Sequence, residues 1–175
     1  MQPSNHRLDQ LDTRLTSWMA RHSITLLRVG LGIIFLWFGV LKFFPGLSPA
    51  QDLATRTIAA LTLGIVGPAI SIPVLATWEC AIGIGLITGR QMRLTLLLLA
   101  AQMLGTLTPL ALFPTETFTL VPLAPTLEGQ YIIKNIVLVA GALVIGATVR
   151  GGHLVPTAEE EPLTHTAHVE HCAEG

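Results

Sequence analysis

Four apolar runs, each close to the length of a membrane-crossing helix, dominate this sequence. They lie at about residues 24–44, 69–88, 92–113 and 129–149. A helix needs roughly 20 predominantly apolar residues to cross the hydrocarbon core of a bilayer. Only 12% of the residues are charged, whereas a soluble domain usually carries about 25%. The sequence therefore predicts an all-α membrane protein, with four transmembrane helices bundled in a lipid bilayer.

Shorter segments flank these runs. Within residues 1–23, Leu8, Leu11, Leu15 and Trp18 recur at helical spacing between charged residues, so we expect an amphipathic cytoplasmic helix on the membrane surface. Residues 49–63 predict a short amphipathic helix at the outer surface between spans one and two, or a re-entrant piece, because the segment is too short and too polar to cross the membrane. The membrane domain would thus occupy residues 24–150. The tail, residues 151–175, is rich in glutamate and histidine and predicts disorder.

The distribution of arginine and lysine predicts an orientation. Four spans place both ends of the chain on one side, and that side carries most of the basic residues: Arg7, Arg14, Arg21, Arg90, Arg93 and Arg150. The opposite side holds Arg56, with Lys42 near its surface. Basic residues favour cytoplasmic loops. We therefore expect a multi-pass membrane protein with its N and C termini in the cytoplasm.

Several polar residues fall inside the apolar runs, where ionisable groups are costly and often mark functional sites. Glu79 lies near the middle of the second run. It is either protonated or paired with a cation, and we prefer a pair with Lys42 or Lys134, which lie in the same half of the membrane. The predicted depths allow one outward-facing pocket, whose candidate residues are Lys42, Glu79, Gln102, Glu128, Tyr131, Lys134 and Asn135.

Each of these residues also has a structural interpretation. A buried pair at Glu79 can serve only to fix the register of two helices. Lys42 can extend its ammonium to the outer headgroups, and Arg28 can anchor its helix at the inner interface. Cys80 follows Glu79 in an apolar run, where a lone cysteine usually acts as a small apolar side chain.

Other classes of site have little support in the sequence. His165, His168, His171 and Cys172 in the tail are weak candidates for a metal site, because the segment is terminal and acidic. The net charge of -1 argues against nucleic-acid binding. The sequence shows neither a nucleotide-binding glycine motif nor a pair of membrane histidines for haem. Any redox chemistry would therefore need a quinone or a cofactor of a partner.

Three stretches carry a family resemblance: RVGLGIIFLWFGVLKFFPG, WECAIGIGLITGR and LEGQYIIKNIVLVAGALVIGA. Over residues 24–150 the chain resembles the DoxX-like superfamily of bacterial four-helix membrane proteins, which includes DoxX and DoxD. The stretch TPLALFPTETF leans toward the YkgB/RclC-type branch. The resemblance implies a redox-linked or accessory membrane subunit in oxidative or chlorine stress, and for DoxD-type members an association with quinone. It supplies no list of catalytic residues.

Three functions follow as hypotheses. The leading one is a redox- or stress-linked subunit whose pocket binds a quinone or another small ligand beside a redox enzyme partner. We expect no catalysis by this chain alone; if it takes part in a reaction, it would be as a quinone-linked oxidoreductase subunit. The alternatives are a membrane scaffold that recruits an enzyme through its tail, and a small permease acting as a homodimer.

Overall fold

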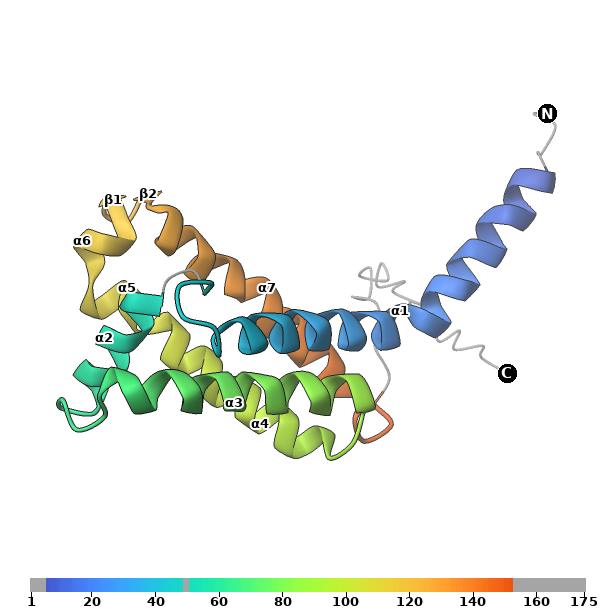
Figure 1. Ribbon diagram of the computed structural model, residues 1–175. Helices are drawn as coiled ribbons and strands as arrows, with labels where there is room; N and C mark the ends of the chain where they lie inside the picture. The colour runs from blue at the N-terminus through green and yellow to red at the C-terminus, as the bar shows by residue number, and fades with distance from the viewer. Residues whose placement is uncertain (1–5, 49–50, 153–175) are drawn as a thin grey trace, which may run out of the picture.

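The computed structural model describes residues 6–48 and 51–152 and is a helical bundle (Figure 1). Four helices in this part of the chain are long and apolar enough to cross a membrane, once α4 is taken together with the short helix that follows it. The prediction of an all-α membrane bundle is confirmed. The long helices are α1 (His6–Leu41), α3 (Pro68–Thr88), α4 (Met92–Leu107) and α7 (Leu127–Thr148). The short elements are α2 (Gln51–Leu61), α5 (Pro109–Leu112), α6 (Pro114–Thr117), β1 (Phe118–Leu120) and β2 (Ala124–Pro125).

Helix α1 joins two segments that the sequence analysis separates. The amphipathic N-terminal segment and the first span form one helix of 36 residues, because neither glycine nor proline occurs between His6 and Val29. The first part of α1 projects beyond the bundle (Figure 1). The helix ends at Leu41, three residues before the expected end at residue 44. Proline disfavours helical backbone in the residue before it, and ahead of Pro45 the chain tightens into turns in which Lys42 N donates to Gly39 O.

The third span and the loop after it also differ in detail from the expectation. Pro109 divides the span into α4 and α5, which together end at Leu112. The loop expected between the third and fourth spans contains α6 and a small antiparallel β1–β2 hairpin. Strands of three and two residues are too short to leave an alternating sequence pattern. Helix α7 then begins at Leu127, two residues early, because Thr126 Oγ1 accepts from Gly129 N at 3.2 Å and caps it.

The closest helix contact joins α1 and α3, which pack against each other more extensively than any other pair in the described residues. Glycines make this approach possible. A Cβ atom on Gly83 would lie 2.6 Å from Leu36 N, and one on Gly39 would lie 2.9 Å from Cys80 N. Small residues at such positions let two helix backbones touch, which is how helices commonly associate in membranes.

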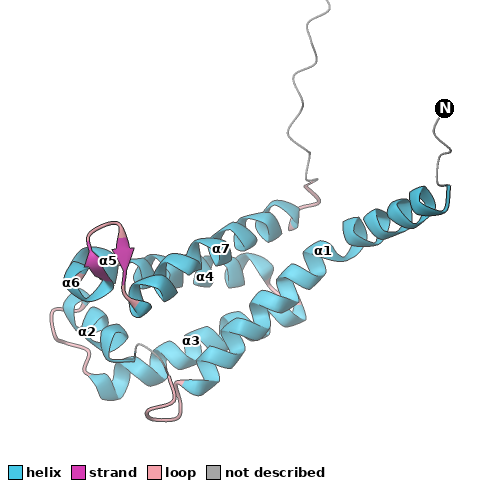
Figure 2. Ribbon diagram, turned by 90° about the horizontal axis from the view of Figure 1, so that it is seen from above, coloured by secondary structure: helices cyan, strands magenta, loops and turns pink. Residues whose placement is uncertain are grey.

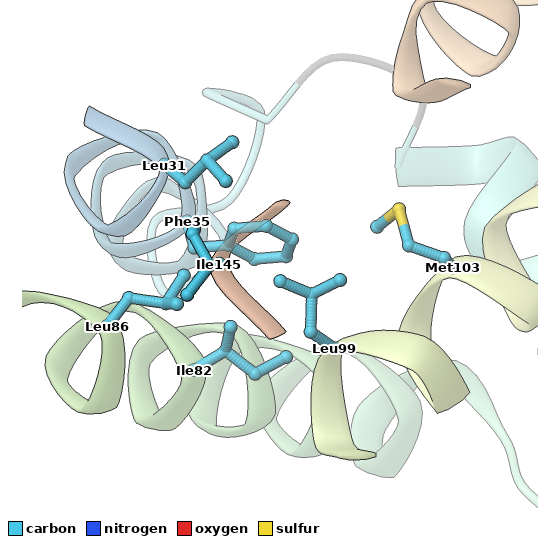
Figure 3. Packing of buried hydrophobic residues seen from close by; sticks show 7 residues of the cluster. All are labelled: Leu31, Phe35, Ile82, Leu86, Leu99, Met103 and Ile145. Carbon is cyan, nitrogen blue, oxygen red and sulfur yellow. The ribbon is translucent and has the colours of Figure 1, made fainter. Parts of the chain in front are cut away.

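Side chains from all four long helices meet in one buried apolar cluster (Figure 3). Its members are Leu31, Phe35, Ile82, Leu86, Leu99, Met103 and Ile145. Many large apolar side chains on the outside of the bundle are exposed, such as Leu97 at 68% and Val137 at 70%. A lipid environment accounts for this exposure, because lipid tails solvate apolar surfaces as well as another side chain does.

Helix α2 covers one end of the bundle and packs against α3 and α5 (Figures 1 and 2). At this end α1 and α4 finish while α3 and α7 begin, and we call it the α2 end. The helix occupies Gln51–Leu61, inside the expected range 49–63. Residues 49–50 lie outside the described residues. A turn with Leu63 at φ 53° and Gly64 at φ 80° follows the helix and leads into α3.

Candidate ligand-binding site

A cavity of about 620 Å³ lies at the α2 end, between α1, α2, α3, α4 and α7. Its walls are mostly apolar and include Phe35, Phe38, Leu53 and Trp78. A minority of the lining residues are polar: Lys42, Thr57, Ser71, Glu79, Gln102, Thr106, Glu128, Tyr131 and Asn135. Six of the seven residues predicted from the sequence for one pocket therefore line one cavity; Lys134 is the exception.

An ion pair joins two walls of this cavity. Lys42, just after the end of α1, donates from Nζ to Glu79 Oε2 on α3 at 2.7 Å. The two side chains are 12% and 11% exposed. Lys42 Nζ also lies 3.5 Å from the carbonyl oxygen of Phe38, one helical turn earlier. Of the two lysines expected as partners of Glu79, the structure brings Lys42 to it, so the ammonium of Lys42 is turned inward.

A third helix completes the polar cluster. Gln102 on α4 donates from Nε2 to Glu79 Oε1 at 3.0 Å, so both carboxylate oxygens of Glu79 accept a hydrogen bond. The hydroxyl of Thr106 donates to the backbone carbonyl of Gln102 at 2.9 Å. Buried polar groups in the described part of the chain all have hydrogen-bond partners, as stable interiors require. We call Lys42, Glu79 and Gln102 the polar cluster.

Helix α7 supplies the polar residues of the facing wall. Glu128, Tyr131 and Asn135 are spaced three and four residues apart, which places them on one side of the helix, and all three line the cavity. Lys134 is exposed, and its ammonium lies over the ring of Tyr131, 5.9 Å from the centroid. One residue along a helix turns the side-chain direction by about 100°, and this turn separates Lys134 from the cavity.

The sequence analysis misses a second ion pair near the cavity. Arg56 on α2 binds both carboxylate oxygens of Glu116 on α6, with Nη1 2.7 Å from Oε1. Its guanidinium carbon also lies 5.5 Å from the centre of the Phe113 ring. The hydrogen bond to Glu116 is the main cause that raises the pKa of Arg56 above its ordinary value. The two residues are 60 positions apart, and nothing in the local sequence pairs them.

Two further residues singled out by the sequence lie away from the cavity. Arg28 places its guanidinium beside Gly89, at the C-terminal end of α3, where the helix dipole favours a positive charge. Cys80 is partly buried against Gly39. The tail residues His165, His168, His171 and Cys172 lie outside the described residues. Within the part that is described, no group of three or more metal-ligating side chains occurs.

Comparison with known proteins places the chain in a family. The model of the DoxX family matches residues 23–113, just over half of the sequence. The chain belongs to the DoxX family. The match runs from the membrane part of α1 through α4 and includes the whole polar cluster, whereas α7 lies beyond it. The finer YkgB/RclC assignment stays an interpretation. No curated protein and no solved structure matches the chain.

Proposed function

We propose that this DoxX-family protein binds a small amphiphilic molecule in the cavity at the α2 end and serves as a subunit in redox or stress-linked membrane chemistry. The ligand class that we favour is a quinone. The observation that carries the proposal is the cavity itself, where apolar walls from five helices surround one compact polar cluster.

The size and lining of the cavity support ligand binding. Small-molecule sites commonly enclose about 300–1,000 Å³, with mainly apolar walls and a few well-placed polar groups. The cavity of about 620 Å³ lies within this range. Its apolar walls suit a ring or hydrocarbon chain, and the polar cluster can orient a head group.

The chemistry of the polar cluster favours a neutral ligand with oxygen acceptors. The ammonium of Lys42 carries three N–H donors, and its contacts with Glu79 and Phe38 use at most two of them. A remaining N–H can donate to a carbonyl oxygen. Because the opposite charges of Lys42 and Glu79 offset each other, a charged head group gains little from the cluster. A quinone offers two neutral carbonyl acceptors on an apolar ring.

Location and orientation belong to the same proposal. Most of the basic residues lie toward the end of the bundle opposite α2, and Arg90 and Arg93 lie there at the turn between α3 and α4. By the positive-inside rule that end faces the cytoplasm of a bacterial inner membrane. The α2 end, with the cavity, then faces the outer side.

Native mass spectrometry of the protein, gently extracted from its own membrane, tests the proposal. We expect a co-purifying quinone that is lost in Glu79→Gln and Lys42→Met but retained in Val137→Ala, which changes an exposed side chain outside the cavity. A protein that carries no quinone in any variant would contradict the proposal. A bound enzyme without quinone would favour the scaffold, and a ligand-free dimer would favour the permease.

A further inference from the structure

Helix α2 forms a roof over the cavity. Five of its side chains line the cavity: Leu53, Ala54, Thr57, Ile58 and Leu61. Two of them are buried, with Leu53 3% exposed and Thr57 4% exposed. The roof therefore covers the cavity around Leu53 and Thr57, whereas Leu61 at the end of α2 is 54% exposed.

The Arg56–Glu116 pair holds this roof in place. It ties α2 to α6 by two parallel hydrogen bonds, and the Phe113 ring packs under the guanidinium. Paired hydrogen bonds between arginine and a carboxylate fix geometry as well as adding attraction. Arginine keeps its positive charge throughout the physiological pH range, and the hydrogen bond to Glu116 raises the pKa of Arg56 further.

The side of the cavity between α1 and α7 reaches the outer surface, as does its rim on α3, where Ile70 and Val74 line the cavity and are 59% and 55% exposed. Helices α1 and α7 pack closely at the far end of the bundle, where a Cβ atom on Gly141 would lie 3.1 Å from the Leu31 side chain. Toward the α2 end α7 runs away from α1 (Figure 1), and the cavity reaches between them. Ile34 and Phe38 of α1 and Tyr131 of α7 all line it. They are also 41%, 42% and 49% exposed, so the cavity wall here is part of the outer surface.

We propose that the ligand is a molecule dissolved in the bilayer, with an apolar chain, which reaches the polar cluster sideways between α1 and α7 beneath α2. This inference rests on the proposed function and specifies how its ligand reaches the cavity. Ile34 and Phe38 lie within a membrane-spanning helix, so the opening faces hydrocarbon. An apolar chain can remain there while the head group contacts Lys42 and Gln102.

The test measures how fast a tailed quinone reaches the cavity. Trp78 lines the cavity and reports quinone binding by fluorescence quenching once Trp18→Phe and Trp37→Phe remove the other two tryptophans. The full chain in liposomes is mixed with decylubiquinone in a stopped-flow instrument. The narrowed variant is Ile34→Phe with Leu138→Phe, which line the cavity on α1 and α7. Its matched control is Ile33→Phe with Val137→Phe, at exposed positions outside the cavity.

We expect the narrowed variant to slow the saturable quenching about tenfold, because bulkier side chains on the entry route raise the barrier to entry; a tenfold change corresponds to about 1.4 kcal/mol. The control variant and the roof variant Arg56→Gln should keep the parent rate. An unchanged rate in the narrowed variant would overturn the sideways route, and faster quenching in Arg56→Gln would overturn it in favour of entry through the roof. Parent protein that shows no saturable quenching would overturn the proposed function as well.

Discussion

Removal of the Lys42 ammonium while Glu79 is kept is the sharpest test of the polar cluster. In Lys42→Met the carboxylate of Glu79, 11% exposed in the native protein, loses a partner at 2.7 Å and keeps only the Gln102 amide at 3.0 Å. Loss of one partner from a buried ion pair costs about 3–5 kcal/mol, because an uncompensated charge stays behind. We expect the free energy of unfolding to fall by that amount.

The Glu79→Gln variant and the double variant complete a double-mutant cycle with Lys42→Met. Glu79→Gln should cost less, about 1–3 kcal/mol, because Lys42 follows the last residue of α1 and can extend its ammonium toward the headgroups. The double variant, with both substitutions, should recover most of the loss of Lys42→Met, since no buried charge remains. Lys134→Met is the matched control and should cost less than about 1 kcal/mol, the scale of an exposed cation–π contact.

Reversible unfolding in mixed micelles, with sodium dodecyl sulfate as denaturant and helical ellipticity as the signal, measures all four variants. The reasoning is refuted if Lys42→Met costs no more than Lys134→Met. It is also refuted if the cost of the double variant equals the sum of the two single costs, because the pair would then contribute no coupling energy.

Three further predictions concern the packing and the roof. Gly83→Ala should lower the free energy of unfolding by about 1–3 kcal/mol, because the added Cβ would meet Leu36 N at 2.6 Å. Gly30 has open space around it, so Gly30→Ala should be neutral or slightly stabilising in the same micelle assay. Leu99→Ala should lower the free energy of unfolding by about 2–5 kcal/mol, since Leu99 is 1% exposed in the apolar cluster. An equal loss of stability in the lipid-facing variant Leu97→Ala would contradict this account. Protease cleavage within residues 51–64 should be faster in Arg56→Gln than in the parent at low salt, and the difference should shrink at high salt because the ion pair is exposed. Because the pKa of Arg56 is raised, the contribution of its positive charge to holding α2 in place is complete below the ordinary arginine pKa and is lost only above it. The ratio of the cleavage rate of Arg56→Gln to that of the parent should therefore stay the same between about pH 6 and pH 9.

The helical architecture could be predicted because hydropathy and length suffice to identify spans in lipid. The continuity of α1 was missed because a change from polar to apolar composition at residue 24 resembles a boundary. The absence of glycine and proline between His6 and Gly30 was the signal that the helix continues.

The candidate site was only partly predictable, for geometric reasons. Depth along each span follows from residue count, so Lys42, Glu79 and Gln102 could be placed at compatible heights. Rotation about the helix axis depends on packing, and for this reason Lys134 could not be distinguished from Asn135 as a cavity residue. The contact of Arg56 with Glu116 depends on how two separate loops fold back, which no periodicity encodes.

The glycine contact between α1 and α3 has a consequence for how the cavity responds to a ligand. Lys42 and Glu79 are anchored on the two helices whose backbones touch at Gly39 and Gly83, so these helices behave as a single rigid frame. A bound molecule meets donors and acceptors already in position, and little conformational entropy is lost in ordering them. Any widening of the cavity must then come from movement of α2, α4 or α7 relative to this frame.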